Sequence, residues 1–205
     1  VFFPGSQVIS QRSRPAAADI ERVNYIMRSG RAFLYPIYKS THDRGDVITT
    51  DYPSTTAVWR DHMVMWSKDV GRSIDYLYTR PEIDKTRIGY FGNSWGSGMA
   101  PLFLAVEPRF SLALLNVGGF YLQAALPEAD PVNFAPRVTI PVLMLNGRFD
   151  FFFPTESSQE SMFRSLGTLP EHKRRVVYDA SHTLPRNEVI REFTAWMDKY
   201  WGSAR

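Results

Sequence analysis

Apolar residues along the chain follow two patterns, short continuous runs and longer stripes at helical spacing. The continuous runs have the length of buried strands and occupy residues 1–3, 32–38, 87–91, 110–117, 141–146 and 175–178. The stripes repeat every three or four residues and predict helices over residues 20–27, 59–77, 99–106, 155–166 and 189–200. Because strands that alternate with helices form a parallel sheet with helices on both faces, the pattern predicts an α/β fold.

Boundary residues support this division. Asp19 stands where the first helix would begin, and Gly30 stands where it would end. Residues 39–54 and 121–138 show neither pattern and are expected to be loops. The second of these loops is too short to form a large lid domain.

Chain length limits the number of domains. With 205 residues and 44% hydrophobic residues, the chain can bury one sizeable core and is too short for two ordinary domains. We therefore expect a single domain over residues 1–205. The chain opens on an apolar run without an initiator methionine, so we expect it to be a processed or truncated piece of something longer.

Composition excludes several function classes. The formal net charge is only +3, and the basic residues are scattered, with the closest cluster at residues 173–175, so no nucleic-acid partner is expected. No apolar run approaches the length of about 18 residues that indicates a membrane span, so no membrane association is expected. The absence of cysteine excludes disulfides, thiolate metal sites and a cysteine nucleophile. No signal peptide is recognisable, and the compartment stays open.

One short motif points to chemistry. Residues 92–96 read Gly-Asn-Ser-Trp-Gly and lie between a predicted strand and a predicted helix. In a nucleophile elbow, a serine sits on a tight strand-to-helix turn that raises its hydroxyl above the sheet, and small neighbours are needed because the backbone passes close by. We therefore expect Ser94 to be a nucleophile, with the Trp95 amide as one donor to an oxyanion.

A second oxyanion donor is expected from the loop after an earlier strand. Residues 3–7 form such a loop at the right place in the chain order. We expect the Ser6 amide to be this donor, with the amide of Gln7 as the alternative.

A serine hydroxyl needs a base to remove its proton, and in this type of site the acid and then the histidine follow the serine in the chain. Of the four histidines, His42 and His62 precede Ser94, and His172 precedes the last predicted strand. His182 follows that strand directly. It is therefore the predicted base.

The acid that orients this histidine is expected at the end of another strand, because open parallel sheets place their sites at the carboxyl ends of the strands. Asp150 follows the apolar run 141–146 and is the predicted acid. Asp179 lies too close to His182 in the chain, and Asp130 lies in the irregular segment. The phenylalanines at positions 149 and 151–153 beside this acid fit either a substrate pocket or the core.

These motifs resemble the α/β-hydrolase superfamily, and within it the lidless branch around dienelactone hydrolases and prolyl-oligopeptidase-type catalytic domains. The stretch 133–150 with Pro154 looks like the entry to the acid strand in that branch. Three features depart from the pattern. The chain lacks the cysteine nucleophile of dienelactone hydrolases, two strands that usually open the fold would precede Val1, and Pro101 lies inside the helix after the elbow.

The resemblance and the motifs together predict a serine hydrolase that cleaves small-molecule carboxylic esters through an acyl-enzyme, with neither a metal nor an organic cofactor. A peptidase or acyltransferase on the same fold stays open, as does a non-catalytic binding or regulatory module, because the fold alone does not define activity. Dinucleotide binding is disfavoured, because Ser94 occupies a position where the glycine-rich phosphate turn requires glycine.

Overall fold

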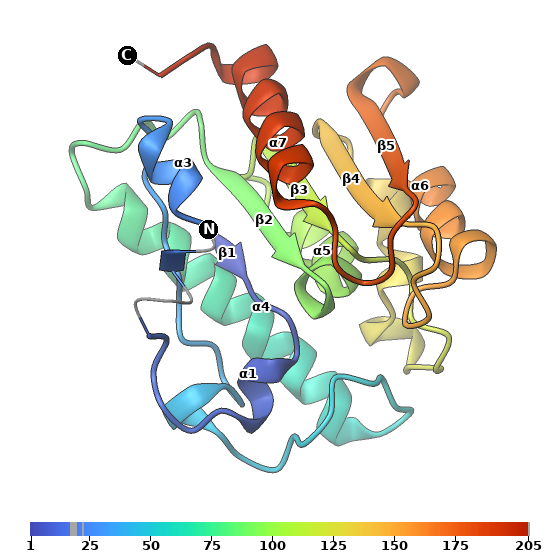
Figure 1. Cartoon of the computed structure of the whole chain (residues 1–205). Helices are drawn as coiled ribbons and strands as arrows, with labels where there is room; N and C mark the ends of the chain where they lie inside the picture. Colours follow the sequence, from blue (N-terminus) through green and yellow to red (C-terminus); the bar gives the residue numbers. More distant parts are fainter. Residues whose placement is uncertain (17–19, 22, 205) are drawn as a thin grey trace.

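A computed structural model describes residues 1–16, 20–21 and 23–204 and contains a five-stranded parallel sheet (Figure 1). The strands follow the chain order β1-β2-β3-β4-β5, and every neighbouring pair is parallel. Their bounds are β1 (Phe2–Phe3), β2 (Gly89–Asn93), β3 (Leu112–Asn116), β4 (Val142–Gly147) and β5 (Lys173–Tyr178). The predicted α/β fold with a parallel sheet is confirmed, and each of these strands lies within two residues of its predicted bounds.

Helices connect the strands and cover both faces of the sheet. The α-helices are α1 (Gln7–Ser10), α3 (Asn24–Arg28), α4 (Ala57–Tyr78), α5 (Trp95–Val106), α6 (Ser161–Ser165) and α7 (Arg186–Trp201). Shorter 3-10 segments are η1 (His42–Arg44), η2 (Pro127–Ala129), η3 (Pro131–Asn133), η4 (Ala135–Arg137) and η6 (Pro170–His172), and η5 (Thr155–Glu160) is a π-helix. No helix in the described part of the chain combines the length and apolar character needed to cross a membrane.

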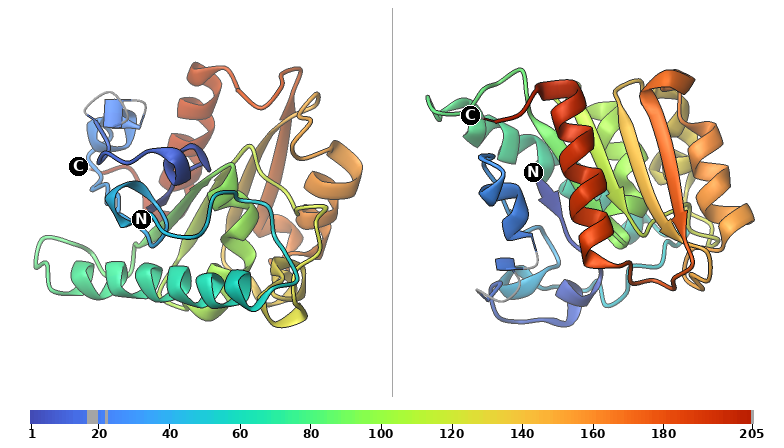
Figure 2. Two further views of the ribbon diagram at one scale, coloured as in Figure 1. Left: turned by 90° about the horizontal axis from the view of Figure 1, so that it is seen from below. Right: turned by 45° about the horizontal axis from the view of Figure 1, so that its top comes forward.

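Side chains of the strands alternate between two cores. Tyr90, Ala113 and Met144 point to the face covered by α4 and α5. Phe91 and Leu114 point to the opposite face, which α7 covers with Phe193, Trp196 and Met197. Figure 2 shows α4 and α7 on opposite sides of the sheet. Because successive residues of a strand face opposite ways, burial of both faces explains why the strands read as continuous apolar runs.

Helix α4 is the element that the sequence predicts most directly. Its apolar stripe, including Met63, Trp66 and Val70, is buried in the core between this helix and the sheet. The Thr56 hydroxyl accepts a hydrogen bond from the Trp59 amide at 3.3 Å and caps the amino end of the helix. Local sequence and tertiary packing therefore agree over its whole length.

The strand predicted over residues 32–38 is absent. This segment passes β1, and the Phe2 amide donates to the Leu34 carbonyl at 2.9 Å, but no ladder follows. Two causes are visible: β1 offers only two residues for pairing, and Pro36 has no amide hydrogen to donate. The apolar residues of the segment pack as side chains instead, with the Tyr35 ring 5.0 Å from the Phe2 ring.

Two predicted helices are shorter or less regular than expected. The helix predicted over residues 20–27 is found as α3, which begins at Asn24, and Asp19, its predicted start, lies outside the described residues. The helix predicted over residues 155–166 is a π-helix followed by the short helix α6. The loop at residues 121–138 contains η2, η3 and η4 and otherwise stays irregular, as predicted.

Candidate active site

Ser94 lies on the turn that connects β2 to α5. Its backbone has φ 51° and ψ −109°, a conformation that is strained for a residue with a side chain. The turn is held on both sides: the Ser94 amide donates to the Asn116 carbonyl at 2.9 Å, and the Ser94 carbonyl accepts from the Ser97 amide at 2.8 Å and the Gly98 amide at 2.9 Å. These bonds hold the hydroxyl of Ser94 at the carboxyl edge of the sheet.

The glycines beside Ser94 are required by close backbone contacts. A Cβ atom on Gly92 would lie 2.7 Å from the carbonyl of Gly96, and a Cβ atom on Gly96 would lie 2.2 Å from the carbonyl oxygen of Phe3. Real Cβ atoms do not approach backbone atoms this closely. The motif therefore reflects the geometry of the turn, as the sequence predicts.

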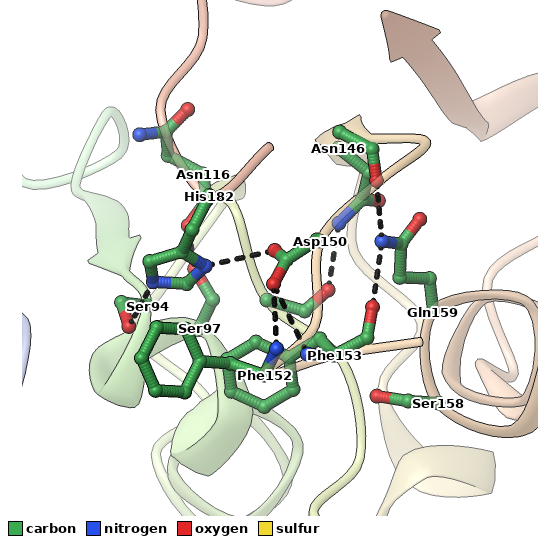
Figure 3. A network of polar contacts seen from close by, with 12 residues as sticks. Ser94, Ser97, Asn116, Asn146, Asp150, Phe152, Phe153, Ser158, Gln159 and His182 are labelled. Atoms are coloured by element: carbon green, nitrogen blue, oxygen red, sulfur yellow. Dashed lines mark hydrogen bonds and ion pairs between the residues drawn. The ribbon is translucent and has the colours of Figure 1, made fainter. Parts of the chain in front are cut away.

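The three predicted residues Ser94, Asp150 and His182 come together at this edge of the sheet (Figure 3). The Nε2 atom of His182 lies 2.7 Å from Oγ of Ser94, and its Nδ1 atom lies 2.8 Å from Oδ2 of Asp150. A carboxylate only accepts hydrogen bonds, so Nδ1 carries the proton and Nε2 is free to accept one from the serine hydroxyl. The arrangement can deprotonate Ser94.

Asp150 is held by its own loop. Its side chain has no exposed surface, and its Oδ1 atom accepts from the Phe152 amide at 3.0 Å and the Phe153 amide at 3.2 Å. With the bond from His182, the buried carboxylate has three partners, which offsets the cost of removing it from water. The carboxylate is thereby oriented toward His182.

The loops that carry the acid and the histidine are bonded to each other. The Arg148 amide donates to the Tyr178 carbonyl at 2.8 Å, and the Phe149 amide donates to the Ala180 carbonyl at 3.0 Å. A Cβ atom on Gly147 would lie 1.9 Å from the Ser181 carbonyl oxygen, so the two loops touch at this glycine. Because these bonds continue the pairing of β4 with β5, the loops that carry Asp150 and His182 lie side by side.

Other acids and histidines considered from the sequence lie elsewhere. Asp179 is exposed and paired with Arg148 at 2.6 Å, and Asp130 accepts from the Val132 amide at the start of η3. His42 is bonded to the Ser13 carbonyl at 2.6 Å. His62 pairs with Asp46 at 2.9 Å, and His172 lies 3.0 Å from the Tyr200 hydroxyl.

The loop after β1 lies against the nucleophile. A Cβ atom on Gly5 would be 3.5 Å from Cβ of Ser94, and the Gly96 amide donates to the Pro4 carbonyl at 3.1 Å. Among the described residues, the Ser6 amide has no backbone acceptor. The Trp95 amide, at the first position of α5, has no acceptor within that helix. Two candidate donors are therefore available on the elements that flank the serine.

Sequence reasoning missed Gln159, which braces the acid loop. Its side chain is fully buried, and its Nε2 atom donates to the carbonyls of Gly147 and Phe153, both at 2.8 Å. Its Oε1 atom accepts from Arg175 at 3.2 Å. The sequence shows only a glutamine within a predicted helix, and nothing local to it indicates that its amide spans the loop that carries Asp150.

The phenylalanine cluster divides between core and surface. Phe153 is buried, and its ring centroid lies 6.0 Å from that of His182 and 5.1 Å from that of Tyr121. Phe149, Phe151 and Phe152 are exposed. Phe153 therefore belongs to the core, and a substrate pocket lined by the other three rings stays a prediction.

Tyr121 packs against Phe153, the buried ring of this cluster. Its hydroxyl donates to Oδ2 of Asp51 at 2.6 Å. Burial, together with the Asp51 carboxylate, raises the pKa of the Tyr121 hydroxyl well above its ordinary value, so the phenol stays neutral. This bond ties the loop at residues 39–54 to the segment after β3.

Two further observations concern cavities and metal sites. A cavity of about 770 Å³ lies near the amino ends of the strands, where Val1, Gly89 and Trp201 contribute to its wall, and Ser94, Asp150 and His182 are not among its lining residues. Among the described residues, no group of three or more histidine or acidic side chains is arranged to hold a metal ion. The three candidate residues Ser94, Asp150 and His182 lie at the opposite, carboxyl edge of the sheet.

Comparison with known proteins defines the class of fold. A cold-adapted esterase from an Arctic intertidal metagenomic library matches with a TM-score of 0.66 and 19% identity, over 97% of this chain and 81% of that one. A candidate dienelactone hydrolase from Klebsiella pneumoniae matches with a TM-score of 0.54 and 22% identity, over 67% of this chain and 62% of that one. The protein has the α/β-hydrolase fold.

Peptidases are also among the similar proteins. Porphyromonas gingivalis dipeptidyl peptidase 4 matches with a TM-score of 0.58 and 15% identity, over 67% of this chain and 23% of that one. The uncharacterized peptidase YuxL of Bacillus subtilis is 25% identical in an alignment that covers 64% of this chain and 25% of that protein. This chain thus matches about a quarter of that relative's length. No family profile matches the chain. The predicted resemblance to dienelactone hydrolases and prolyl-oligopeptidase-type domains is confirmed.

Proposed function

We propose that this protein is a serine hydrolase that cleaves small-molecule carboxylic esters through an acyl-enzyme. The observation that carries the proposal is the continuous pair of hydrogen bonds from Ser94 to His182 at 2.7 Å and from His182 to Asp150 at 2.8 Å. Nucleophile, base and orienting acid are the three groups that acyl transfer by a serine requires.

In the acylation step, His182 accepts the proton of the Ser94 hydroxyl while Oγ forms a bond to the ester carbonyl carbon. The carbonyl oxygen becomes an oxyanion, which the amides of Trp95 and Ser6 stabilise from the elbow and from the loop after β1. The protonated His182 then gives its proton to the leaving oxygen, and the bond from that oxygen to carbon breaks. An alcohol leaves, and Ser94 carries the acyl group.

Deacylation repeats these roles with water. His182 removes a proton from water, the hydroxide adds to the acyl carbon, and the proton returns to Oγ of Ser94 as the acid leaves. Asp150 keeps the histidine in the tautomer with the proton on Nδ1 and stabilises the imidazolium in each half-reaction. In this mechanism the chain's own side chains supply every proton transfer, without a metal or organic cofactor.

Coverage of the similar structures favours esters over peptides. In its polyethylene-glycol complex the esterase matches 97% of this chain and 81% of its own, whereas the peptidase matches 67% of this chain and 23% of its own. A serine peptidase is the second candidate, because the curated relative bears the name of a peptidase.

The first test is covalent labelling by a fluorophosphonate probe. We expect labelling of the parent protein and none of Ser94→Ala, while Ser73→Ala, which removes a hydroxyl bonded to the Asp69 carbonyl on α4, keeps labelling. Absence of labelling in the folded parent protein would favour a non-catalytic module.

The second test separates the two candidates. Matched nitrophenyl esters and nitroanilides with the same acyl group distinguish an esterase from a peptidase, because only the leaving atom differs. We expect the esters to be hydrolysed with the larger kcat/KM after correction for their intrinsic reactivity. A preference for the anilides, or for dipeptide anilides, would identify a peptidase.

A further inference from the structure

Two exposed phenyl rings stand beside the proposed catalytic histidine. The ring centroid of Phe152 lies 4.8 Å from that of His182, in an edge-on arrangement, and the ring centroid of Phe151 lies 4.1 Å from that of Phe152. Phe152 is 44% exposed, and Phe151 is 73% exposed. Single exposed apolar residues are ordinary on protein surfaces, but two rings in mutual contact at a reactive histidine form a continuous apolar surface.

The backbone under these rings is held in place. The Phe152 amide donates to Asp150, and the carbonyl of the next residue, Phe153, accepts from the buried Gln159 side chain. Figure 3 shows Phe152 below the pair formed by His182 and Asp150. The same carboxylate that orients His182 thus also fixes the loop position from which the Phe152 ring projects.

The proposed reaction places the leaving group next to this surface. To receive the proton from Nε2 of His182, the leaving oxygen must come within about 3 Å of that atom. The acyl oxygen is directed instead toward the amides of Trp95 and Ser6. Because the Phe152 ring touches the imidazole, the carbon atoms attached to the leaving oxygen fall within contact distance of that ring.

Charges near the two rings are already paired. The guanidinium of Arg148, on the same loop, is bonded to Asp179 at 2.6 Å. The carboxylate of Asp150 has no exposed surface and is bonded to His182. The surface that Phe151 and Phe152 present therefore favours an uncharged, apolar group, and a flat aromatic group most of all, since ring pairs gain more than area burial alone.

We propose that Phe152, assisted by Phe151, forms a leaving-group subsite that selects esters of uncharged arylalkyl alcohols. The inference depends on the proposed function of Ser94 and His182 and assigns that site a substrate class.

The test compares acetate esters that differ only in the alcohol: benzyl, ethyl, 2-hydroxyethyl and choline acetate. We expect kcat/KM to be highest for benzyl acetate. In Phe152→Ala, the ratio of kcat/KM for benzyl acetate to that for ethyl acetate should fall about fivefold to tenfold, the size expected for loss of one aromatic contact. Phe151→Ala, at the more exposed position, should lower the same ratio by a smaller factor and provides a second variant.

Phe149→Ala is the matched control, because this phenylalanine lies on the same loop and is 65% exposed, and no ring contact with His182 is found for it in the described structure. In this variant, the ratio of kcat/KM for benzyl acetate to that for ethyl acetate should equal that of the parent. Deacylation of the acetyl-enzyme should also be unchanged in Phe152→Ala, since all four esters share that intermediate.

Four results would overturn the subsite. A loss in Phe152→Ala that is equal for all esters, or that slows deacylation, would mean that the ring only supports His182. A preference of the parent for choline acetate would indicate a cation site. A parent that hydrolyses esters with no change of ratio in the variants overturns the subsite alone, whereas a parent without hydrolysis or labelling overturns the proposed function and the subsite together.

Discussion

At the scale of single residues, the candidate site contains one buried carboxylate. Asp150 accepts bonds from His182 and from the two amides of its own loop, and its side chain has no exposed surface. Asp179 offers the same functional group three residues before the histidine, but it is exposed and bound to Arg148. The difference between them is their position relative to the imidazole.

Asp150→Asn tests this distinction. The amide that replaces the carboxylate can donate to Nδ1 and stabilise the wrong tautomer, so we expect kcat on a chromogenic ester to fall on the order of a thousandfold or more. Asp179→Asn is the matched control and should keep kcat. Circular dichroism should show both variants folded, and ordinary turnover in Asp150→Asn would mean that another acid orients His182.

At the scale of elements, the junction of β2 and α5 tolerates no added atom. In the β1–β2 register Phe3 lies opposite Gly92, and the first turn of α5 passes against the carbonyl of Phe3 at Gly96. The strained backbone of Ser94 persists because these neighbours leave it no alternative. Small residues here serve the close approach of two elements.

Gly96→Ala should therefore destabilise the protein by more than about 3 kcal/mol or prevent folding, because its Cβ atom would lie 2.2 Å from a backbone oxygen. Gly71→Ala on α4 is the matched substitution, with its closest new contact at 3.5 Å from a Glu107 oxygen. It should stabilise the protein by about 0.5–1 kcal/mol by lowering the entropy of the unfolded chain. Urea denaturation measures both, and equal effects would contradict the packing argument.

At the scale of the whole molecule, one ion cluster joins the loop at residues 39–54 to α4. Asp46 lies 2.9 Å from Nε2 of His62 and 3.0 Å from Nζ of Lys39. Burial by itself raises the pKa of the Asp46 carboxyl, but bonds from His62, the Ile48 amide and Lys39 outweigh it and hold the pKa well below its ordinary value. The charged form is therefore stabilised by folding.

The sign of the pH effect follows from this shift. A carboxyl with a lower pKa in the folded state contributes its full stability above the unfolded pKa of about 3.9 and loses it as the pH falls toward the folded value. Asp46→Asn should cost about 2 kcal/mol at pH 7, and its stability should converge with that of the parent as the pH falls below about 4. Asp61→Asn, at an exposed site, should show no such gap in urea denaturation. If the difference in the free energy of unfolding between the parent and Asp46→Asn stayed constant with pH, it would contradict the charge assigned to Asp46.

Residue order and periodicity determine a large part of this protein. The Met63 and Trp66 stripe defines α4, continuous apolar runs locate β1 to β5, and the order of Ser94, Asp150 and His182 is enough to nominate them before any coordinates exist. The stripe and the runs are local features, since backbone geometry sets a period of about 3.6 residues in a helix and a strand buried on both faces is apolar throughout. The need for glycines around Ser94 can also be predicted from the sequence, because the turn that requires them is short.

Tertiary structure alone decides which distant groups meet. Residues 32–38 have the composition of a strand, yet they form no strand because β1 offers only two residues for pairing at that edge. Gln159 braces the loop of Asp150, and of the adjacent phenylalanines, Phe153 is buried while Phe152 is exposed. Such outcomes depend on the packing of surfaces from different elements, which no periodicity along the chain encodes.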